Sequence, residues 1–273
     1  MRLFTFGDSW TEGVGGDSNK ELEYDTPEER TKIRQEFCWP RYLSEILNVE
    51  FINNGIGGAS NNIIFETVSH CLKSNQINRG DFIVIMWTSF LRDDVPFFPK
   101  GEWHFWGERY KSKKHIYTPI FNKTIENNVI FDRASLSYKE FYLTNLYCDT
   151  YYNIINQNYI FYLQHMFNEM GIRYMFCDAF DSLIKNPINQ EIDKTNLINR
   201  KHYWGFENRT FRDLLIETNR KNVWEDNSHF TESQLGKHPN KNGYKLIAEE
   251  IYDFIQKNNL LGYNLKEPYS LLL

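Results

Sequence analysis

Cysteine is scarce in this sequence, with four residues in a chain of 273. None of them stands in a C-x-x-C pair, and their wide spacing fits neither a zinc site nor a disulfide framework. We therefore predict free thiols, no metal and no cofactor. Burial is expected for the three that fall in apolar helix or strand patterns, namely Cys71, Cys148 and Cys177.

Long apolar runs are also missing. No stretch approaches roughly 18 apolar residues, so we expect no transmembrane helix and no membrane partner. The first ten residues contain one arginine, their apolar run stops at Phe6, and no small-residue cleavage site follows, which is unlike a signal peptide. These features predict a cytoplasmic protein, with association with a virus particle as the alternative.

An excess of positive charge is absent too. Lys and Arg total 31 against 36 Asp and Glu, which gives a net charge of −5 and argues against a nucleic-acid binder. Hydrophobic residues at 41% and charged residues at 25% exclude wholesale disorder. Aromatic residues are abundant at 16%, and such rings can fill a core or line a binding cleft.

Short apolar runs alternate with helical patterns along the chain. Strands are predicted at residues 2–6, 49–52, 81–87 and 173–178. Helices are predicted at residues 40–47, after an N-cap at Ser60, and at about 241–256. The polar stretch 12–37 is predicted to be a surface excursion. This alternation, with strands that are apolar on both faces, predicts an α/β fold with a parallel sheet.

Two segments after the third strand break this alternation. Residues of about 93–136 are predicted to be an irregular insertion, and eight aromatic residues lie within 97–121. Residues 136–170 are predicted to form a long helix, and we expect its stripe with Tyr159 and Tyr162 to be core. No repeat or low-complexity linker divides the chain, so we predict a single domain over residues 1–273.

Small and reactive residues follow the predicted strands, where the sites of open α/β sheets form. The first strand leads into G-D-S-W-T-E-G at 7–13, and the second leads into N-N-G-I-G-G at 53–58. The stretch H-P-N-K-N-G at 238–243 precedes the last helix. In this order the three blocks resemble those of the SGNH (GDSL-type) hydrolases. The resemblance spans residues 7–251 and implies a three-layer α/β/α sandwich, the flavodoxin-like fold of that family.

The resemblance also implies a serine esterase that hydrolyses acyl or acetyl esters. Ser9 would be the nucleophile and His238 the general base, because a serine hydroxyl attacks an ester only when a base removes its proton. The backbone N–H groups of Ser9 and Gly58 would stabilise the oxyanion of the tetrahedral intermediate.

A further block of the family, Gly-x-Asn-Asp, follows the third strand, and here the chain departs from it with W-T-S-F at 87–90. Ser89 stands in the place of the asparagine, which in the family is an oxyanion donor, and its hydroxyl can also donate. Thr88 and Arg92 could contribute as well. Ser89 is therefore predicted to be the third member of the oxyanion hole.

The acid of the triad is the second departure. The family places an aspartate three residues before the histidine, where this chain has Leu235. Asp226 is the predicted acid, with Glu232 or a Ser–His dyad as alternatives. His229 follows Asp226 at Asp-x-x-His spacing and is the alternative base.

The substrate is predicted to be a small-molecule or carbohydrate ester. Exposed tryptophan rings stack on sugars, so the aromatic insertion favours O-acetyl groups on a carbohydrate; the rings could equally pack on an acyl chain or on another subunit in a homo-oligomer. Substrate binding is predicted for Asp8, Thr88, Arg92, Trp103 and Trp106. Two alternatives remain open. One is a non-catalytic binding or virion structural module on the same fold, and the other is an acyltransferase with the same nucleophile.

Overall fold

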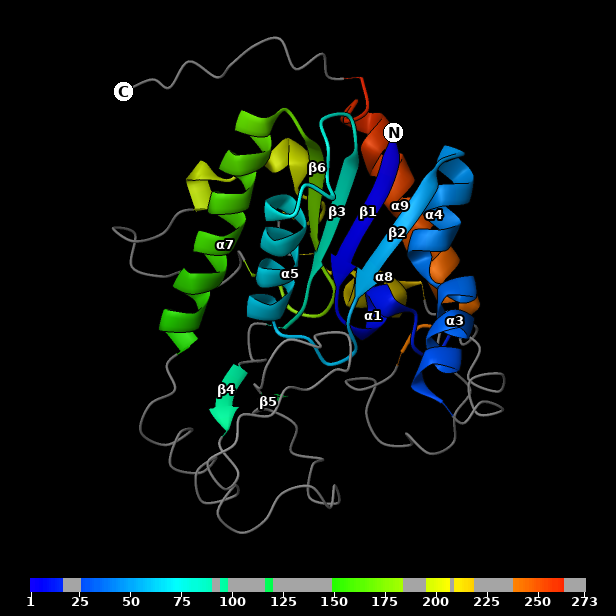
Figure 1. Ribbon diagram of the computed structural model, residues 1–273. Coiled ribbons are helices and arrows are strands. Elements are labelled where there is room, and N and C mark those ends of the chain that lie inside the picture. The colour runs from blue at the N-terminus through cyan, green and yellow to red at the C-terminus, as the bar shows by residue number, and fades with distance from the viewer. Residues whose placement is uncertain are drawn as a thin grey trace.

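A four-stranded parallel sheet lies at the centre of the molecule, with the strand order β2-β1-β3-β6 (Figure 1). The computed structural model describes residues 1–16, 26–89, 94–97, 116–119, 149–183, 195–206, 209–218 and 238–262. The strands are β1 (Arg2–Gly7), β2 (Glu50–Gly55), β3 (Phe82–Trp87) and β6 (Arg173–Asp178). The predicted parallel α/β fold is confirmed.

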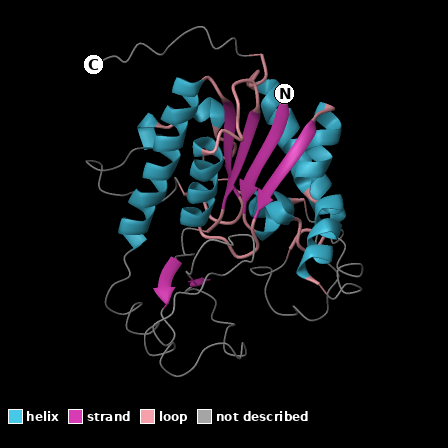
Figure 2. Ribbon diagram, in the orientation of Figure 1, coloured by secondary structure: helices cyan, strands magenta, loops and turns pink. Residues whose placement is uncertain are grey.

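Helices cover both faces of this sheet, as Figure 2 shows. One face carries α4 (Trp39–Leu47) and α9 (Lys241–Lys257), and the other carries α5 (Asn61–Lys73) and α7 (Asp149–Met170). Successive side chains of a strand point to opposite faces. Val84 of β3 accordingly packs in the core under α9, while Ile85 packs in the core under α5. The architecture is thus a three-layer α/β/α sandwich.

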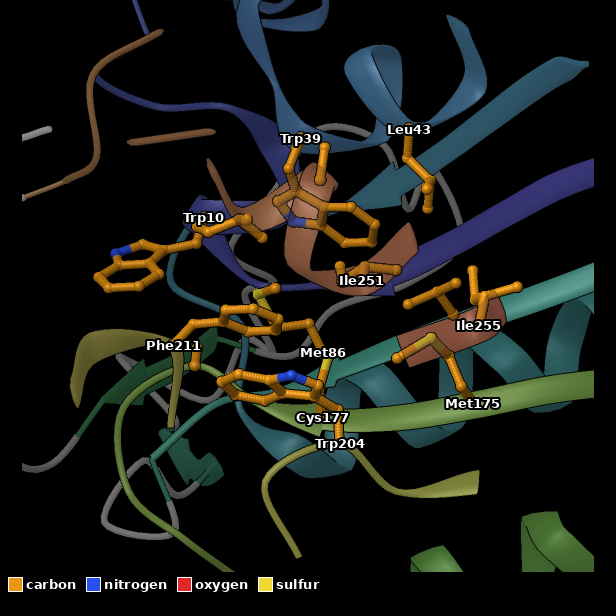
Figure 3. Packing of buried hydrophobic residues seen from close by; sticks show 14 of the residues in the cluster. Trp10, Trp39, Leu43, Met86, Met175, Cys177, Trp204, Phe211, Ile251 and Ile255 are labelled. Atoms are coloured by element: carbon orange, nitrogen blue, oxygen red, sulfur yellow. The ribbon is translucent and has the colours of Figure 1, made fainter. Parts of the chain in front are cut away.

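The core under α9 is rich in aromatic rings close to the carboxyl ends of the strands. Trp204 and Phe211 stack with their ring centroids 3.9 Å apart, beside Met86 and Cys177 (Figure 3). Phe211 begins the short helix α8 (Phe211–Glu217), whose capping box at Thr210 was not predicted although its T-x-x-D pattern is visible in the sequence. This packing gives the strand ends a rigid base.

Two further helices and two 3₁₀ turns lie among the described residues. They are the helix α1 (Ser9–Glu12), the helix α3 (Pro27–Phe37), and the 3₁₀ turns η3 (Thr195–Leu197) and η4 (Arg200–His202). The polar stretch 12–37 thus contains a surface helix that was not predicted. Within the predicted insertion, β4 (Asp94–Phe97) and β5 (Ile116–Pro119) pair antiparallel, and the rest of 93–136 lies outside the described residues.

Two predictions made from local sequence patterns are confirmed, namely the N-cap at Ser60 and the burial of two cysteines. The Ser60 hydroxyl caps α5 by accepting the N–H of Ile63 at 3.2 Å, as predicted. Cys71 and Cys177 are buried free thiols, also as predicted, while Cys148 lies outside the described residues. None of the described helices combines the length and the apolar character that a membrane span requires.

The predicted core stripe of α7 is wrong for Tyr162, which is 55% exposed. The buried face of the helix runs instead through Gln157, Ile160 and Gln164. Gln164 donates to the Leu197 carbonyl at 2.9 Å and accepts a second hydrogen bond from backbone. Aromatic residues surround α7 on several sides, so their spacing alone does not define its buried face.

Candidate active site

The segments that follow β1, β2 and β3 meet at one edge of the sheet. Gly7 at the end of β1 pairs with Gly55 at the end of β2, and Trp87 at the end of β3 pairs with Asp178 at the end of β6. The edge formed by the carboxyl ends of parallel strands is where ligand sites of open α/β sheets lie. The first two sequence blocks, which follow β1 and β2, therefore meet at this edge (Figure 1).

Ser9 is the first residue of α1, directly after the tight turn that ends β1. Asp8 caps this helix, because its Oδ1 accepts the N–H of Trp10 at 3.0 Å. Its Oδ2 accepts the hydroxyl of Thr88 at 2.8 Å, which joins the nucleophile turn to the end of β3. Ser9 is thereby fixed between two strand ends, and 6% of the residue is exposed.

His238 reaches Ser9 from the other end of the chain. Its Nε2 lies 3.0 Å from Ser9 Oγ. With the imidazole proton on Nδ1, Nε2 can accept the Ser9 proton. This geometry brings together two of the predicted catalytic residues.

The peptide around His238 is bound to the segment that follows Ser9. The N–H of Lys241 donates to the Gly16 carbonyl at 3.0 Å, and the Tyr244 hydroxyl donates to the Val14 carbonyl at 2.6 Å. Asn240 caps α9 through its side-chain oxygen. His238 and Ser9 thus belong to segments that share one hydrogen-bonded framework.

The glycine turn after β2 packs directly against α1. A Cβ at Gly55 would collide with the backbone of Glu12, so this close approach requires glycine. Asn53 supports the turn by accepting the Gly55 N–H at 2.9 Å and donating to the Thr11 carbonyl at 2.8 Å. Gly58 follows with φ +76°, in the left-handed region.

The predicted oxyanion donors differ in their hydrogen bonding. Over the part of the chain that the structure describes, the backbone N–H groups of Ser9 and Gly58 have no acceptor. Both are thus available to a ligand atom. Ser89, in contrast, donates its hydroxyl to the Asp181 carboxylate. Its role in the oxyanion hole stays a prediction.

The substrate-binding role of Asp8 and Thr88 stays a prediction, and in the structure their side chains are hydrogen-bonded to each other. Both residues are 0% exposed, and the Thr88 hydroxyl donates to the Asp8 carboxylate. Thr88 also exchanges two backbone hydrogen bonds with the Asn61 amide, at 2.8 and 3.1 Å. These hydrogen bonds join the turn that carries Ser9 to the end of β3 and to the start of α5.

Several predicted site residues lie outside the described residues. They are Arg92, Trp103, Trp106, Asp226, His229 and Glu232. The triad acid and the aromatic substrate contacts therefore stay predictions. Among the residues that are described, no group of three or more His, Cys, Asp or Glu side chains could hold a metal ion.

The buried carboxyl of Asp178, at the end of β6, was not predicted to be important. Asp178 Oδ1 accepts the Tyr203 hydroxyl at 2.6 Å, and Oδ2 accepts the Leu183 N–H at 3.2 Å. Burial raises the pKa of Asp178 from 3.8 to about 7. No local pattern connects Asp178 with Tyr203, because they meet only through the bridge between residues 176 and 203.

No protein-family model and no curated protein matches the chain. Among solved structures, it is similar to a protein of the G-D-S-L family from Desulfitobacterium hafniense DCB-2, with 11% identity, coverage of 93% of this chain and 98% of that one, and a TM-score of 0.45. A psychrotrophic esterase from Pseudoalteromonas sp. shows 13% identity, coverage of 94% and 97%, and a TM-score of 0.43. An acetylxylan esterase from Geobacillus stearothermophilus shows 10% identity, coverage of 98% and 96%, and a TM-score of 0.41. These similarities are distant, and the function proposed below is drawn from the site geometry.

Proposed function

We propose that this protein is a serine esterase that hydrolyses acyl or acetyl esters. The observation that carries the proposal is the 3.0 Å contact between Ser9 Oγ and His238 Nε2. A serine hydroxyl within hydrogen-bond reach of an imidazole is the arrangement that makes serine nucleophilic. The pair stands at the strand ends, and the N–H groups of Ser9 and Gly58 have no acceptor among the described residues.

The reaction follows from these groups. His238 Nε2 takes the hydroxyl proton while Ser9 Oγ bonds to the ester carbonyl carbon, and the carbonyl electron pair moves to its oxygen. The tetrahedral intermediate then expels the alcohol, which receives the proton from His238. Water repeats the sequence on the acyl-enzyme, releasing the carboxylic acid and regenerating Ser9.

The N–H groups of Ser9 and Gly58 are the proposed oxyanion donors. Removing one such donor costs roughly 2.7–4 kcal/mol of transition-state stabilisation in serine hydrolases. A left-handed glycine suits this place, because a Cβ there would strain the turn that presents the N–H. Asp226 stays the proposed acid that orients His238.

For the substrate we propose O-acetyl groups on a carbohydrate. The support is the aromatic content of residues 97–121, which include Trp103 and Trp106. Aromatic faces stack on sugar rings, and a single acetyl group needs little room at the nucleophile. An acetylated oligosaccharide should therefore be cleaved faster than a long-chain p-nitrophenyl ester.

The nucleophile is tested with p-nitrophenyl acetate and the variant Ser9→Ala. We expect kcat to fall by at least about 10⁴-fold, because the variant lacks the hydroxyl that faces the His238 imidazole. Ser74→Ala is the matched control, since Ser74 is an exposed serine at the end of α5. A fluorophosphonate should label the wild type and the control but leave Ser9→Ala unlabelled. Equal hydrolysis by wild type and Ser9→Ala would refute the assignment.

A further inference from the structure

Glu12 links the nucleophile helix to the glycine turn. It is the last residue of α1, one turn after Ser9, and only 8% of it is exposed. Its Oε2 accepts the backbone N–H of Gly57 at 2.6 Å. Its Oε1 accepts from Arg34 Nη1 of α3 at 2.9 Å, which makes a largely buried ion pair. The sequence resemblance assigns no role to Glu12.

The hydrogen bond falls on the residue directly before the proposed oxyanion donor. Gly57 has no side chain to restrict its backbone, and a Cβ there would lie 2.7 Å from Glu12 Oε2. The carboxylate thus occupies the space that a side chain would fill. It holds the Gly57 N–H with a charge-assisted bond, which is stronger than a bond between neutral groups. With Gly57 fixed, the next peptide, which carries the Gly58 N–H, has a defined direction.

We propose that Glu12 is a positioning residue that aims the Gly58 N–H at the oxyanion. The inference rests on the proposed esterase function. Because Ser9 and Glu12 belong to the same helical turn, one rigid element carries the nucleophile and sets the oxyanion donor. Oxyanion donors stabilise the transition state only when they are already oriented before the reaction.

Arg34 compensates the charge of Glu12 in this arrangement. A buried, uncompensated carboxylate next to an oxyanion would oppose the negative charge that develops there. The guanidinium of Arg34 balances the charge of Glu12 at 2.9 Å. The turn therefore gains a strong acceptor without a net negative charge beside the reacting oxygen.

The test compares Glu12→Ala with Glu12→Gln on p-nitrophenyl acetate. Glu12→Ala removes the acceptor, and we expect kcat to fall about 10- to 100-fold while KM changes less than about threefold, since a misdirected donor weakens transition-state binding. Glu12→Gln keeps one oxygen acceptor in the same volume, so kcat should recover part of that loss. Glu45→Gln is the matched control, because Glu45 pairs with Arg41 in an exposed ion pair. It should retain wild-type kcat.

A direct readout of the turn accompanies the kinetics. In ¹⁵N NMR spectra, the Gly57 amide proton should shift upfield in Glu12→Ala, and the exchange of the Gly57 proton with solvent should accelerate. Thermal unfolding shows whether each variant is folded. If Glu12→Ala does not fold, the comparison of Glu12→Gln with wild type tests the positioning role. We then expect a loss of kcat in Glu12→Gln and no loss in Glu45→Gln.

The outcomes separate the inference from the function on which it rests. An active wild type with unchanged kcat in both Glu12 variants overturns the positioning role and leaves the esterase intact. A kcat loss that Glu45→Gln shares in full, or a loss confined to KM, overturns it as well. A wild type that neither hydrolyses the ester nor reacts with a fluorophosphonate refutes the esterase, and the positioning role falls with it.

Discussion

The carboxyl-end edge of the sheet has two halves with different hydrogen bonding. In the half at β1 and β2, the N–H groups of Ser9 and Gly58 have no acceptor among the described residues, and Ser9 faces His238. In the half at β3 and β6, polar groups are joined to one another. Thr88 binds Asp8 and Asn61, and Asp178 binds Tyr203.

In terms of the proposed function, this difference separates a reactive half from a framework half. Buried polar groups cost free energy unless they are hydrogen-bonded, so a fold satisfies them wherever function does not require otherwise. N–H donors that have no acceptor at a strand end are consistent with a ligand atom that accepts their hydrogen bonds. The framework half fixes the edge on which the reactive half is built.

The largest expected effect is a loss of kcat when a residue of the reactive half alone is replaced. Replacing His238 by glutamine removes the base while keeping a polar side chain of similar length. General-base catalysis contributes about 10²–10⁴-fold, so kcat on p-nitrophenyl acetate should fall by that factor. His70→Gln, at an exposed position of α5, is the control and should leave kcat unchanged. Full activity of His238→Gln would reassign the base, with His229 as the next candidate.

The second effect concerns the framework half and its pH dependence. Burial raises the folded-state pKa of Asp178 from 3.8 to about 7, so between about pH 4 and pH 7 the folded state holds a proton that the unfolded state releases. The contribution of Asp178 to stability is therefore complete below about pH 4 and is lost as the pH rises to about 7. The free energy of unfolding lost over this pH range amounts to at most roughly 4 kcal/mol.

Asp178→Asn isolates this contribution because the amide does not titrate. Urea unfolding of both proteins from pH 5 to pH 8 should show the wild type losing stability relative to the variant. Parallel curves over this range would mean that Asp178 does not titrate there. Such a result would leave Asp178 with a purely structural role, as the acceptor of the Tyr203 hydroxyl and the Leu183 N–H.

The smallest effect tests the connection between the halves. Thr88→Val keeps the shape of the side chain but removes the hydroxyl that binds Asp8. A buried carboxylate oxygen left without its partner costs about 1–3 kcal/mol of stability. Thr67→Val is the matched control, since the hydroxyl of this buried threonine binds a carbonyl within α5 and its loss should cost less. Equal losses in the free energy of unfolding would show that the Thr88–Asp8 contact contributes no more than a hydrogen bond within a helix.

The strands were predictable because each is a short apolar run that ends in a turn signal. Residues 173–178 were predicted with the bounds that β6 has, and β2 differs mainly by continuing to Gly55. The buried face of α7 was not predictable, because its aromatic residues lie on several sides and its amides find buried partners only in the folded chain. Local patterns report burial well only when one face alone is apolar.

By itself, the sequence determined the order of strands and helices, the nucleophile candidate Ser9 and the glycines of the turn. Those features depend on residues that are neighbours along the chain, where sterics and periodicity act directly. Only the tertiary structure brought His238 to Ser9 across 229 positions and turned Glu12 toward Gly57. These contacts depend on how the sheet and its helices pack, and no local pattern encodes a distance between residues that meet only after folding.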